Sequence, residues 1–202
     1  RDTDFLALTK AAQKKQIDLV VVGPEAPLAA GIVEHFQAIG IPIFGPTKQA
    51  ARIESSKTFS EDLMQKYGIP CAKGAAFSDY QSAVAYIKQQ RMPVWIKADG
   101  LAAGKGAIIA ESIPSAIETL SSLMEKKTLG ISGEKVIIQE NLTGREMSVF
   151  AITDGKTVLP LAPACDYKRV YDGDQGPNTG GMGSYSPPEF SSPELEKTAL
   201  EK

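Results

Sequence analysis

The sequence predicts a mixed α/β protein, and three observations carry that prediction. Residues 1–50 alternate between helical spacing of apolar residues and short β-branched runs, a pattern typical of a parallel sheet. Residues 94–110 hold two apolar strands around a glycine-rich loop. Further along, Asp154-Gly155 joins two apolar runs, which is a strong hairpin signal. The chain is therefore expected to contain both parallel and antiparallel strands.

The N-terminal part supplies the alternation. Thr3–Lys15 has helical spacing, and Ile17–Val22 is predicted as a strand buried on both faces because it is mostly apolar and β-branched. A helix is expected to begin at Pro27 and to end at Gly40. Pro42–Phe44 then forms a minimal second strand, which completes the order helix, strand, helix, strand.

The remaining chain is predicted to continue with short helices and strands. Ser55 or Ser56 can cap a helix over Lys57–Tyr67, which Gly68 ends. A last helix begins after Ser192. The other helices are expected at 80–90 and 115–126, and the strands at 75–77, 94–97, 107–110, 136–140, 146–153 and 157–161.

Residues 165–188 are predicted as one long loop. This stretch holds five glycines, three prolines and several charges. Long loops without regular structure are uncommon in compact domains and usually carry function. The segment is therefore a candidate binding loop.

Composition and charge exclude several classes of function. Net charge is -2 over 202 residues, and the 22 basic residues are scattered, which disfavours nucleic-acid binding and docking on a membrane surface. No apolar run approaches the roughly 18 residues of a membrane-spanning helix. His35 is the only histidine, so a histidine triad or multi-histidine metal site within this chain is excluded. Cys71 and Cys165 are interpreted as reduced structural thiols of a cytoplasmic protein.

The glycine-rich loop is the strongest functional signal. Glycines let the main chain approach an anion, and Lys97 and Lys105 supply neutralising charge before and within the loop. Phosphoryl transfer depends mostly on positioning and charge neutralisation, so lysines and a divalent metal suffice. The segment predicts a polyphosphate held between two strands, and the alternative is a solvent-exposed hairpin loop.

Two commoner phosphate-binding motifs do not fit. A Walker A loop needs glycine where this chain has Asp99, and serine or threonine where it has Gly106. The dinucleotide motif GxGxxG is missing after the strand that ends at Val22, where the sequence is GPEAPL. Neither a P-loop NTPase nor a dinucleotide-binding dehydrogenase is supported.

A second pattern spans Ile137–Val149. An apolar strand leads into a polar hinge, then Gly144, then a strand that opens with Glu146. A carboxylate placed there can accept hydrogen bonds from two ribose hydroxyls. The alternative is an edge-strand glutamate that forms a surface ion pair with Arg145 or a lysine.

These segments resemble a known family. WIKADGLAAGKG, QENLTGRE and DYKRVYDGDQGPNTGGMGSYSP resemble the ATP-grasp enzymes, and within them the phosphoribosylamine–glycine ligase family. VVGPEAPL, IFGPT and SSKTF are similar to the same family in the same order. The likeness runs from about residue 18 to residue 188, and GPNTGGMG is its most specific block.

The resemblance implies the fold and the reaction. Residues 1–54 would be the remnant of a Rossmann-like N-terminal domain, and residues 55–202 an incomplete ATP-grasp unit of α+β subdomains, with 75–142 as the small ATP-covering subdomain. The family joins glycine to 5-phosphoribosylamine, with ATP going to ADP and phosphate through a glycyl phosphate. The alternatives are another ATP-grasp carboxylate–amine ligase and a non-catalytic nucleotide-binding module. A cytoplasmic monomer with small-molecule substrates is expected.

The resemblance also implies binding residues, although it singles out no catalytic side chain. Lys57 and Lys97 would contact the ATP phosphates, and the loop that contains Gly100, Gly104, Lys105 and Gly106 would close over them. Main-chain groups of Gln139, Glu140 and Leu142 would meet adenine. The carboxylate of Glu146 would bind the ribose. Glycine and the phosphoribosylamine would meet Asp166, Lys168, Arg169, Asn178, Thr179, Gly180 and Gly181, whose alternative is a merely solvated, charged loop.

Two departures from the family predict a fragment lacking both ends. The family opens with a GGREH-type segment that helps to bind the phosphoribosyl substrate, and no such segment is present. The family also holds its Mg²⁺ or Mn²⁺ through a Glu-x-Asn arrangement further along. After Pro188 only four glutamates remain, without that arrangement, so no metal ligand is assigned. The piece alone is expected to be inactive.

Overall fold

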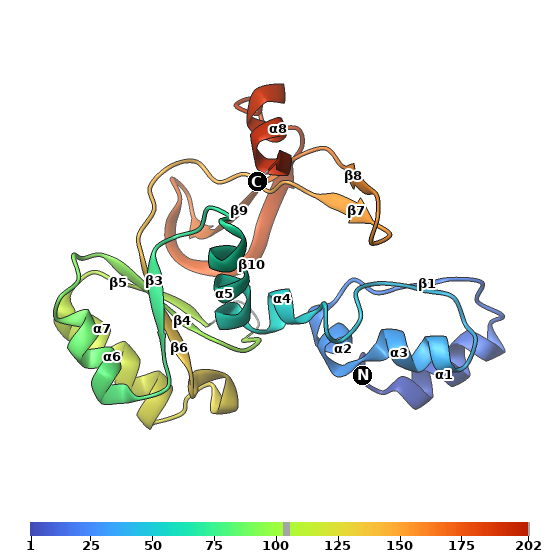
Figure 1. Ribbon diagram of the computed structural model, residues 1–202, viewed down its shortest axis with the longest axis horizontal. Coiled ribbons are helices and arrows are strands. Elements are labelled where there is room, and N and C mark those ends of the chain that lie inside the picture. The colour runs from blue at the N-terminus through green and yellow to red at the C-terminus, as the bar shows by residue number, and fades with distance from the viewer. Residues whose placement is uncertain (103–105, 202) are drawn as a thin grey trace.

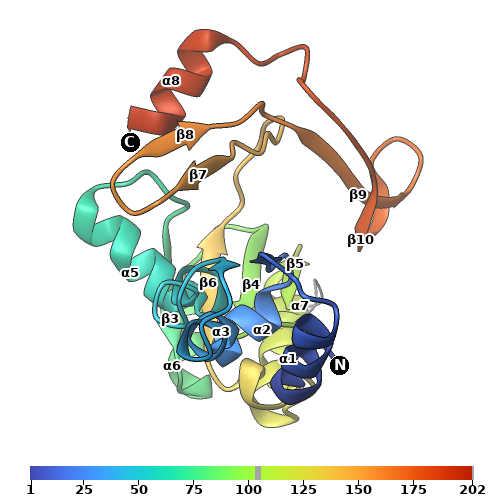
Figure 2. The same cartoon turned by 90° about the vertical axis from the view of Figure 1, so that its right-hand side faces the viewer.

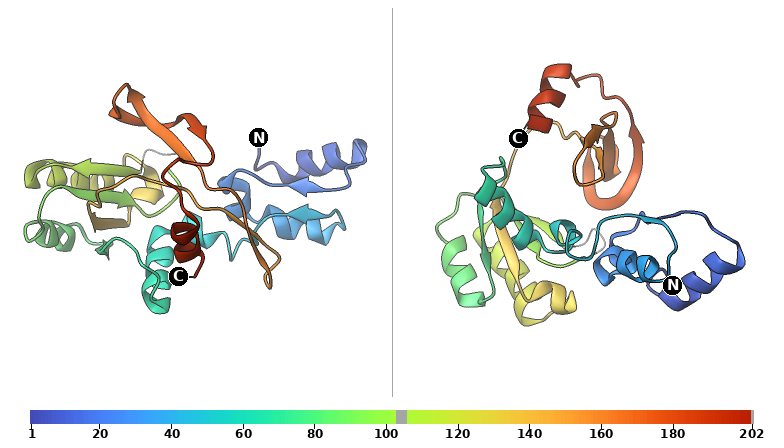
Figure 3. Two further views of the ribbon diagram at one scale, coloured as in Figure 1. Left: turned by 90° about the horizontal axis from the view of Figure 1, so that it is seen from above. Right: turned by 45° about the vertical axis from the view of Figure 1, so that its right-hand side comes forward.

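The computed structural model describes residues 1–102 and 106–201. Figure 1 shows a unit of small helices and two short strands at one side, a sheet backed by two helices at the other, and the C-terminal hairpins and last helix above them. Seen from above in Figure 3, the C-terminal elements lie between the other two parts. The predicted mixture of helix and strand is confirmed. Among the described residues, no helix is both long and apolar enough to cross a membrane.

The N-terminal unit alternates as predicted. Its two strands pair in parallel, Val20 with Ile43 and Val21 with Phe44. Its core consists of Ala12, Leu28, Ile32, Val33, Phe36 and Ala51. The elements are α1 (Phe5–Lys14), β1 (Val20–Val21), α2 (Glu25–Ala30), α3 (Ile32–Ala38) and β2 (Ile43–Phe44).

Two expectations for this unit are wrong. The structure has two helices where a single helix was expected from Pro27, because Gly31 adopts a left-handed φ of 96° that interrupts the helical hydrogen bonds after α2. The first of them, α2, already starts at Glu25. The strand expected to be doubly buried is only two residues long, and Val21 is 65% exposed. β1 pairs only with β2 in the described part of the chain, so the sheet is too narrow to bury it.

Two helices lead from this unit into the rest of the chain. They are α4 (Arg52–Ser55) and α5 (Lys57–Tyr67). The Ser56 hydroxyl accepts a hydrogen bond from the Phe59 amide, and Gly68 ends α5 in a left-handed conformation, so the predicted cap and stop are both confirmed.

A four-stranded antiparallel sheet forms the largest core. Its order is β3 (Gly74–Phe77), β6 (Val136–Glu140), β4 (Val94–Ala98) and β5 (Ala107–Ala110). Pairing of Val94 with Ala110 confirms the predicted strand–loop–strand. The helices α6 (Tyr80–Ile87) and α7 (Ile113–Leu120) cover one face (Figure 2) and bury Ile96, Leu120 and Ile138 completely or almost so.

Both covering helices are shorter than predicted. The helix α6 ends at Ile87, and α7 gives way to a π-helical turn at Ser121–Glu125. A 3₁₀ turn at Gly130–Gly133 then leads into β6. Strand alternation leaves Trp95 and Lys97 of β4 on the face that the helices do not cover. That uncovered face carries the candidate site.

The C-terminal part consists of two hairpins and a helix. β7 (Ala151–Thr153) and β8 (Val158–Pro160) pair around Asp154-Gly155, as predicted, although β7 starts five residues after Glu146. The long loop expected at residues 165–188 is wrong, because β9 (Cys165–Tyr171) and β10 (Gln175–Tyr185) form a bulged hairpin there. The last helix is α8 (Pro193–Glu201).

Candidate nucleotide and substrate site

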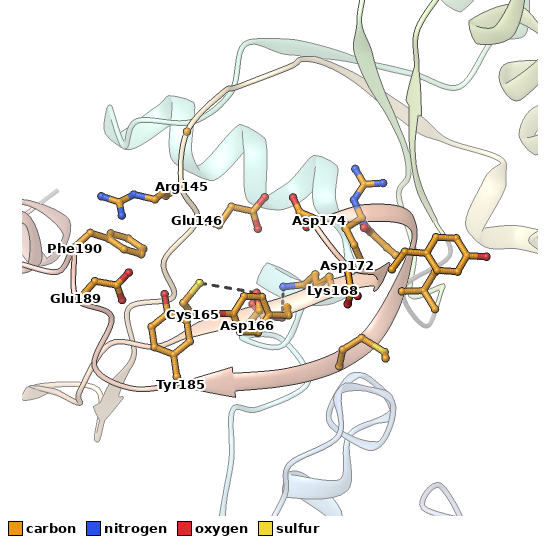
Figure 4. Close-up of a pocket in the computed structure, with 18 of the residues that line it drawn as sticks. Arg145, Glu146, Cys165, Asp166, Lys168, Asp172, Asp174, Tyr185, Glu189 and Phe190 are labelled. Atoms are coloured by element: carbon orange, nitrogen blue, oxygen red, sulfur yellow. Dashed lines mark hydrogen bonds and ion pairs between the residues drawn. The ribbon is translucent and has the colours of Figure 1, made fainter.

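A pocket of about 800 Å³ opens between the β9–β10 hairpin, the segment before β7 and the uncovered face of the sheet. Glu146 lines it (Figure 4). Trp95 of β4 also lines it. Five carboxylates and three cations surround the space, so it suits ligands that carry both signs of charge. The charged lining residues are Arg145, Glu146, Asp166, Lys168, Arg169, Asp172, Asp174 and Glu189.

Two lysines stand on the uncovered side of the sheet. Burial and then the positive charge of Lys57 lower the pKa of the half-buried Lys97, whereas Glu61 and Glu146 act in the opposite direction. The Lys57 ammonium donates to the Gly100 carbonyl at 3.2 Å. The two lysines are thus close enough to repel each other, as two groups that share one polyanion would be.

A buried polar pair lies beside these lysines. Glu61 is 4% exposed and Gln139 is 8% exposed, and each has an Oε1 atom without a hydrogen-bond partner. Burial raises the pKa of Glu61, and the Gln139 side chain opposes that shift. Gln139 is therefore in place near the lysines, but with its side chain buried against α5.

The start and end of the glycine loop are tightly packed. A Cβ on Gly100 would lie 2.6 Å from the Ser132 hydroxyl, and one on Gly106 would lie 2.7 Å from Ala102 Cβ. Glycine is required at both positions because the main chain passes so near its neighbours. Gly104 and Lys105 lie outside the described residues.

Two expected adenine contacts lie apart from the pocket. The Glu140 carboxylate accepts a hydrogen bond from the Lys73 amide at 2.8 Å, which ties β6 to the segment before β3. Leu142 is 66% exposed. Neither residue lines the pocket, so both of these expected contacts fall outside it.

The β9–β10 hairpin brings most of the predicted substrate residues together. Asp166, Lys168, Arg169 and Asn178 all line the pocket. Lys168 forms an ion pair with Asp166, and the Arg169 guanidinium donates to the Gly176 carbonyl at 2.6 Å. Two of the cationic side chains thus already have partners within the hairpin.

Three predicted substrate residues lie on β10 outside the pocket lining. They are Thr179, Gly180 and Gly181. The Thr179 hydroxyl donates to the Lys168 carbonyl at 2.9 Å and accepts from the Gly181 amide at 3.0 Å. In this structure Thr179 therefore supports the hairpin.

The structure adds pocket residues that the sequence reasoning missed. Trp95 shares its strand face with Lys97, and that alternation was the available signal. Asp172 and Asp174 belong to the β9–β10 turn, and Tyr185 and Phe190 come from the far end of the hairpin. Burial and the Cys165 thiol raise the pKa of Tyr185 to about 12.

No metal centre is built into the described part of the chain. Residues 1–102 and 106–201 contain no group of three or more His, Cys, Asp or Glu side chains placed to hold an ion. The residues described here therefore do not fit a divalent metal by themselves.

The sheet backed by two helices, with lysines on its other face beside a charged pocket, defines the ATP-grasp class. Family models match the whole chain: "Phosphoribosylglycinamide synthetase, N domain" matches residues 1–54, and "Phosphoribosylglycinamide synthetase, ATP-grasp (A) domain" matches residues 55–202. The chain belongs to the phosphoribosylglycinamide synthetase family, as its motifs predict.

Named relatives agree with this assignment. A phosphoribosylamine–glycine ligase of Brucella melitensis is 49% identical over 95% of this chain and 45% of its own length. One from Mesorhizobium japonicum is 50% identical over 98% of this chain and 47% of its own length. The chain thus spans less than half the length of these curated relatives.

Solved structures support the fold. The crystal structure of a phosphoribosylamine–glycine ligase from Thermotoga maritima matches with a TM-score of 0.72 and 38% identity, covering 85% of this chain and 42% of that one. A biotin carboxylase from Campylobacter jejuni matches with a TM-score of 0.70 and 21% identity, covering 83% of this chain and 39% of that one. The second likeness concerns the fold alone.

Proposed function

We propose that the protein containing this chain is an ATP-dependent ligase that joins glycine to 5-phosphoribosylamine. The observation that carries the proposal is the pocket, in which Glu146 and the charged residues of β9 face the sheet that holds Lys97. The relatives bear the name phosphoribosylamine–glycine ligase. Residues 1–54 would form the N-terminal unit and residues 55–202 the ATP-grasp part, with 75–142 as the nucleotide-covering subdomain.

The nucleotide would lie along the uncovered face of the sheet. Lys57 and Lys97 would bind its phosphates together with the glycine loop from Gly100 to Gly106, and the ribose hydroxyls would donate to Glu146. The repulsion between the two lysines supports this role, because a polyanion placed between them removes it. Adenine would meet main-chain groups of residues 139–142.

The reaction follows from the weakness of a carboxylate as an electrophile. One oxygen of the glycine carboxylate attacks the γ-phosphorus of ATP, which releases ADP and forms a glycyl phosphate. The amine of 5-phosphoribosylamine then attacks the acyl carbon, loses a proton and expels phosphate. A pocket of mixed charge suits these substrates, since Asp166 can meet an ammonium group while Lys168 and Arg169 can meet carboxylate or phosphate.

A divalent ion would supply charge neutralisation at the phosphates when bound. Mg²⁺ or Mn²⁺ is the expected ion. The described residues contain no group of three or more side chains that could hold it. We also propose that the protein is a cytoplasmic monomer that binds neither nucleic acid nor membrane, in keeping with its net charge of -2.

The test is ADP release by the complete protein with ATP, Mg²⁺, glycine and freshly made 5-phosphoribosylamine. Sustained ADP release over many turnovers should require both co-substrates, because glycine alone can form the glycyl phosphate only once per site. Release with another acid or amine, and none with this pair, would indicate a different carboxylate–amine ligase. ATP binding without turnover of any pair would indicate a nucleotide-binding module, and would overturn the proposal.

A further inference from the structure

The start of α5 is capped twice, and the second cap comes from Asp99, the residue that follows β4. A helix leaves its first amides without partners inside the helix. The Ser56 hydroxyl accepts from the Phe59 amide at 3.3 Å, as a local cap does. The Thr58 amide donates instead to the Asp99 carboxylate at 2.7 Å, across 41 positions in the sequence. The Ser56 hydroxyl also donates to both Asp99 carboxylate oxygens at 3.3 Å.

Further hydrogen bonds close a network around Asp99. The Lys57 amide donates to the Asp99 carbonyl at 3.2 Å, and the Asp99 amide donates to the Lys135 carbonyl at 2.9 Å. The Lys135 ammonium donates to the Thr58 hydroxyl at 3.0 Å. Thr58 is only 4% exposed and the other residues of this set are half-buried, so these bonds are partly shielded from water. We call Ser56, Lys57, Thr58, Asp99 and Lys135 the Asp99 network.

The network fixes Lys57 without neutralising it. The ion pairs within 4.0 Å among the described residues include none between Asp99 and a lysine. The Asp99 carboxylate faces the amide end of α5, while the Lys57 ammonium reaches Gly100 with one of its three donors. The charge of Lys57 therefore stays available to an anion.

From this arrangement we infer that Asp99 is a positioning residue for nucleotide binding, which sets the Lys57 ammonium at the entrance of the glycine loop. The inference rests on the proposed role of Lys57 at the ATP phosphates. Asp99 itself would touch no ligand. It acts through the first turn of α5, since the same carboxylate that caps the helix orients the residue beside the cap.

The test is a double-mutant cycle on ATP affinity, measured by titration calorimetry of the complete protein with ATP and Mg²⁺. Asp99→Ala and Lys57→Met should each weaken binding about tenfold. The double variant should bind no more weakly than Lys57→Met alone, because Asp99 acts only through Lys57. Asp99→Asn keeps an acceptor oxygen for the Thr58 amide and should retain the affinity of the unchanged protein within about twofold.

A matched control exists on α6. Asp79 is the local N-cap of that helix, it accepts from the Ser82 amide at the same 2.7 Å distance, and it does not line the pocket. Asp79→Ala should lower the thermal midpoint as a lost cap does, yet leave ATP affinity unchanged. If the Asp99→Ala variant does not fold, the Asp99→Ser variant is used in its place. The serine side chain stays polar, but its hydroxyl is one atom too short to accept the bond from the Thr58 amide.

The outcomes separate the inference from the proposed function. Full additivity of Asp99→Ala and Lys57→Met, or equal affinity in the Asp99→Ala and Asp79→Ala variants, would overturn the positioning role while leaving the nucleotide site intact. An unchanged protein that binds no ATP would overturn the proposed function itself. Faster exchange of the Thr58 amide hydrogen in Asp99→Ala, but not in Asp79→Ala, is the direct structural readout expected.

Discussion

The charge of Lys97 responds to the groups that surround it. Burial and the neighbouring Lys57 lower its pKa, so it loses its proton at a lower pH than an exposed lysine does. ATP affinity should therefore fall as pH rises through that lowered pKa. Lys57→Met removes one of the two causes and should move the fall to higher pH, although it weakens binding at every pH.

Titration calorimetry with ATP between neutral and alkaline pH checks this prediction. The matched control is Lys66→Met, which removes a lysine from the last turn of the same helix. In Lys66→Met, the pH at the midpoint of the fall in ATP affinity should equal that of the unchanged protein. A Lys57→Met profile with an unshifted midpoint would contradict the electrostatic coupling between the two lysines.

Glu61 gives a second pH dependence, in stability. Burial holds the pKa of Glu61 above its ordinary value, so ionised Glu61 is less favourable in the folded chain than in the unfolded chain. Below the ordinary value both states are protonated and the cost vanishes. As pH rises through the raised pKa, the free energy of unfolding falls. Glu61→Gln should lack this fall, and urea unfolding at a series of pH values measures the difference.

At the scale of residues, the sequence located side chains that belong to local motifs. Lys57 begins the capped helix α5 and Lys97 lies on β4, as predicted, whereas Glu146 lies five residues before the strand that it was expected to open. The charges of Lys57 and Glu146 both act on Lys97. Trp95 and Phe190 were missed because the pocket forms from segments almost a hundred positions apart, which no local pattern describes. The roles of all these residues remain predictions.

At the scale of elements, the pairing of β3 with β6 depends on Gly74. A Cβ there would lie 2.5 Å from the Ile138 carbonyl oxygen and 2.7 Å from Gln139 Cγ, distances that real contacts do not reach. Gly74→Ala should therefore separate the strands and cost about 1–3 kcal/mol of unfolding free energy. Gly183→Ala, a β10 glycine with open space around its Cβ position, is the control for urea unfolding. Equal costs would contradict the steric explanation.

The elements also show where local patterns mislead. Apolar alternation located β4 and β5 because their side chains pack against one core. It missed β9 and β10, whose glycines indicate a loop when taken alone. Gly176 and Gly181 have positive φ angles, and the register shifts twice along this hairpin. Bulges use such residues inside a paired strand, so a glycine-rich stretch of sequence can still form a sheet.

At the scale of the molecule, the described residues form two separate apolar cores. One is centred on Phe36 in the N-terminal unit, and the other surrounds Ile96 and Leu120 beneath the sheet. They share no residue. The helices α4 and α5 lie between the two units (Figure 1), and α5 carries Lys57. The proposed nucleotide-binding face therefore belongs to the sheet and α5, and its stability should not depend on the N-terminal core.

The only tryptophan, Trp95, makes this separation measurable, because it lies on β4 at the pocket and far in sequence from the N-terminal core. Phe36→Ala should cost about 3–5 kcal/mol within the N-terminal unit. Urea unfolding followed by circular dichroism should then show an early loss of helix, while the Trp95 fluorescence midpoint stays in place. Ile96→Ala should shift the fluorescence midpoint instead, at a cost of about 2–5 kcal/mol. If Phe36→Ala moved both signals together, the two cores would unfold as one cooperative unit and the separation would be refuted.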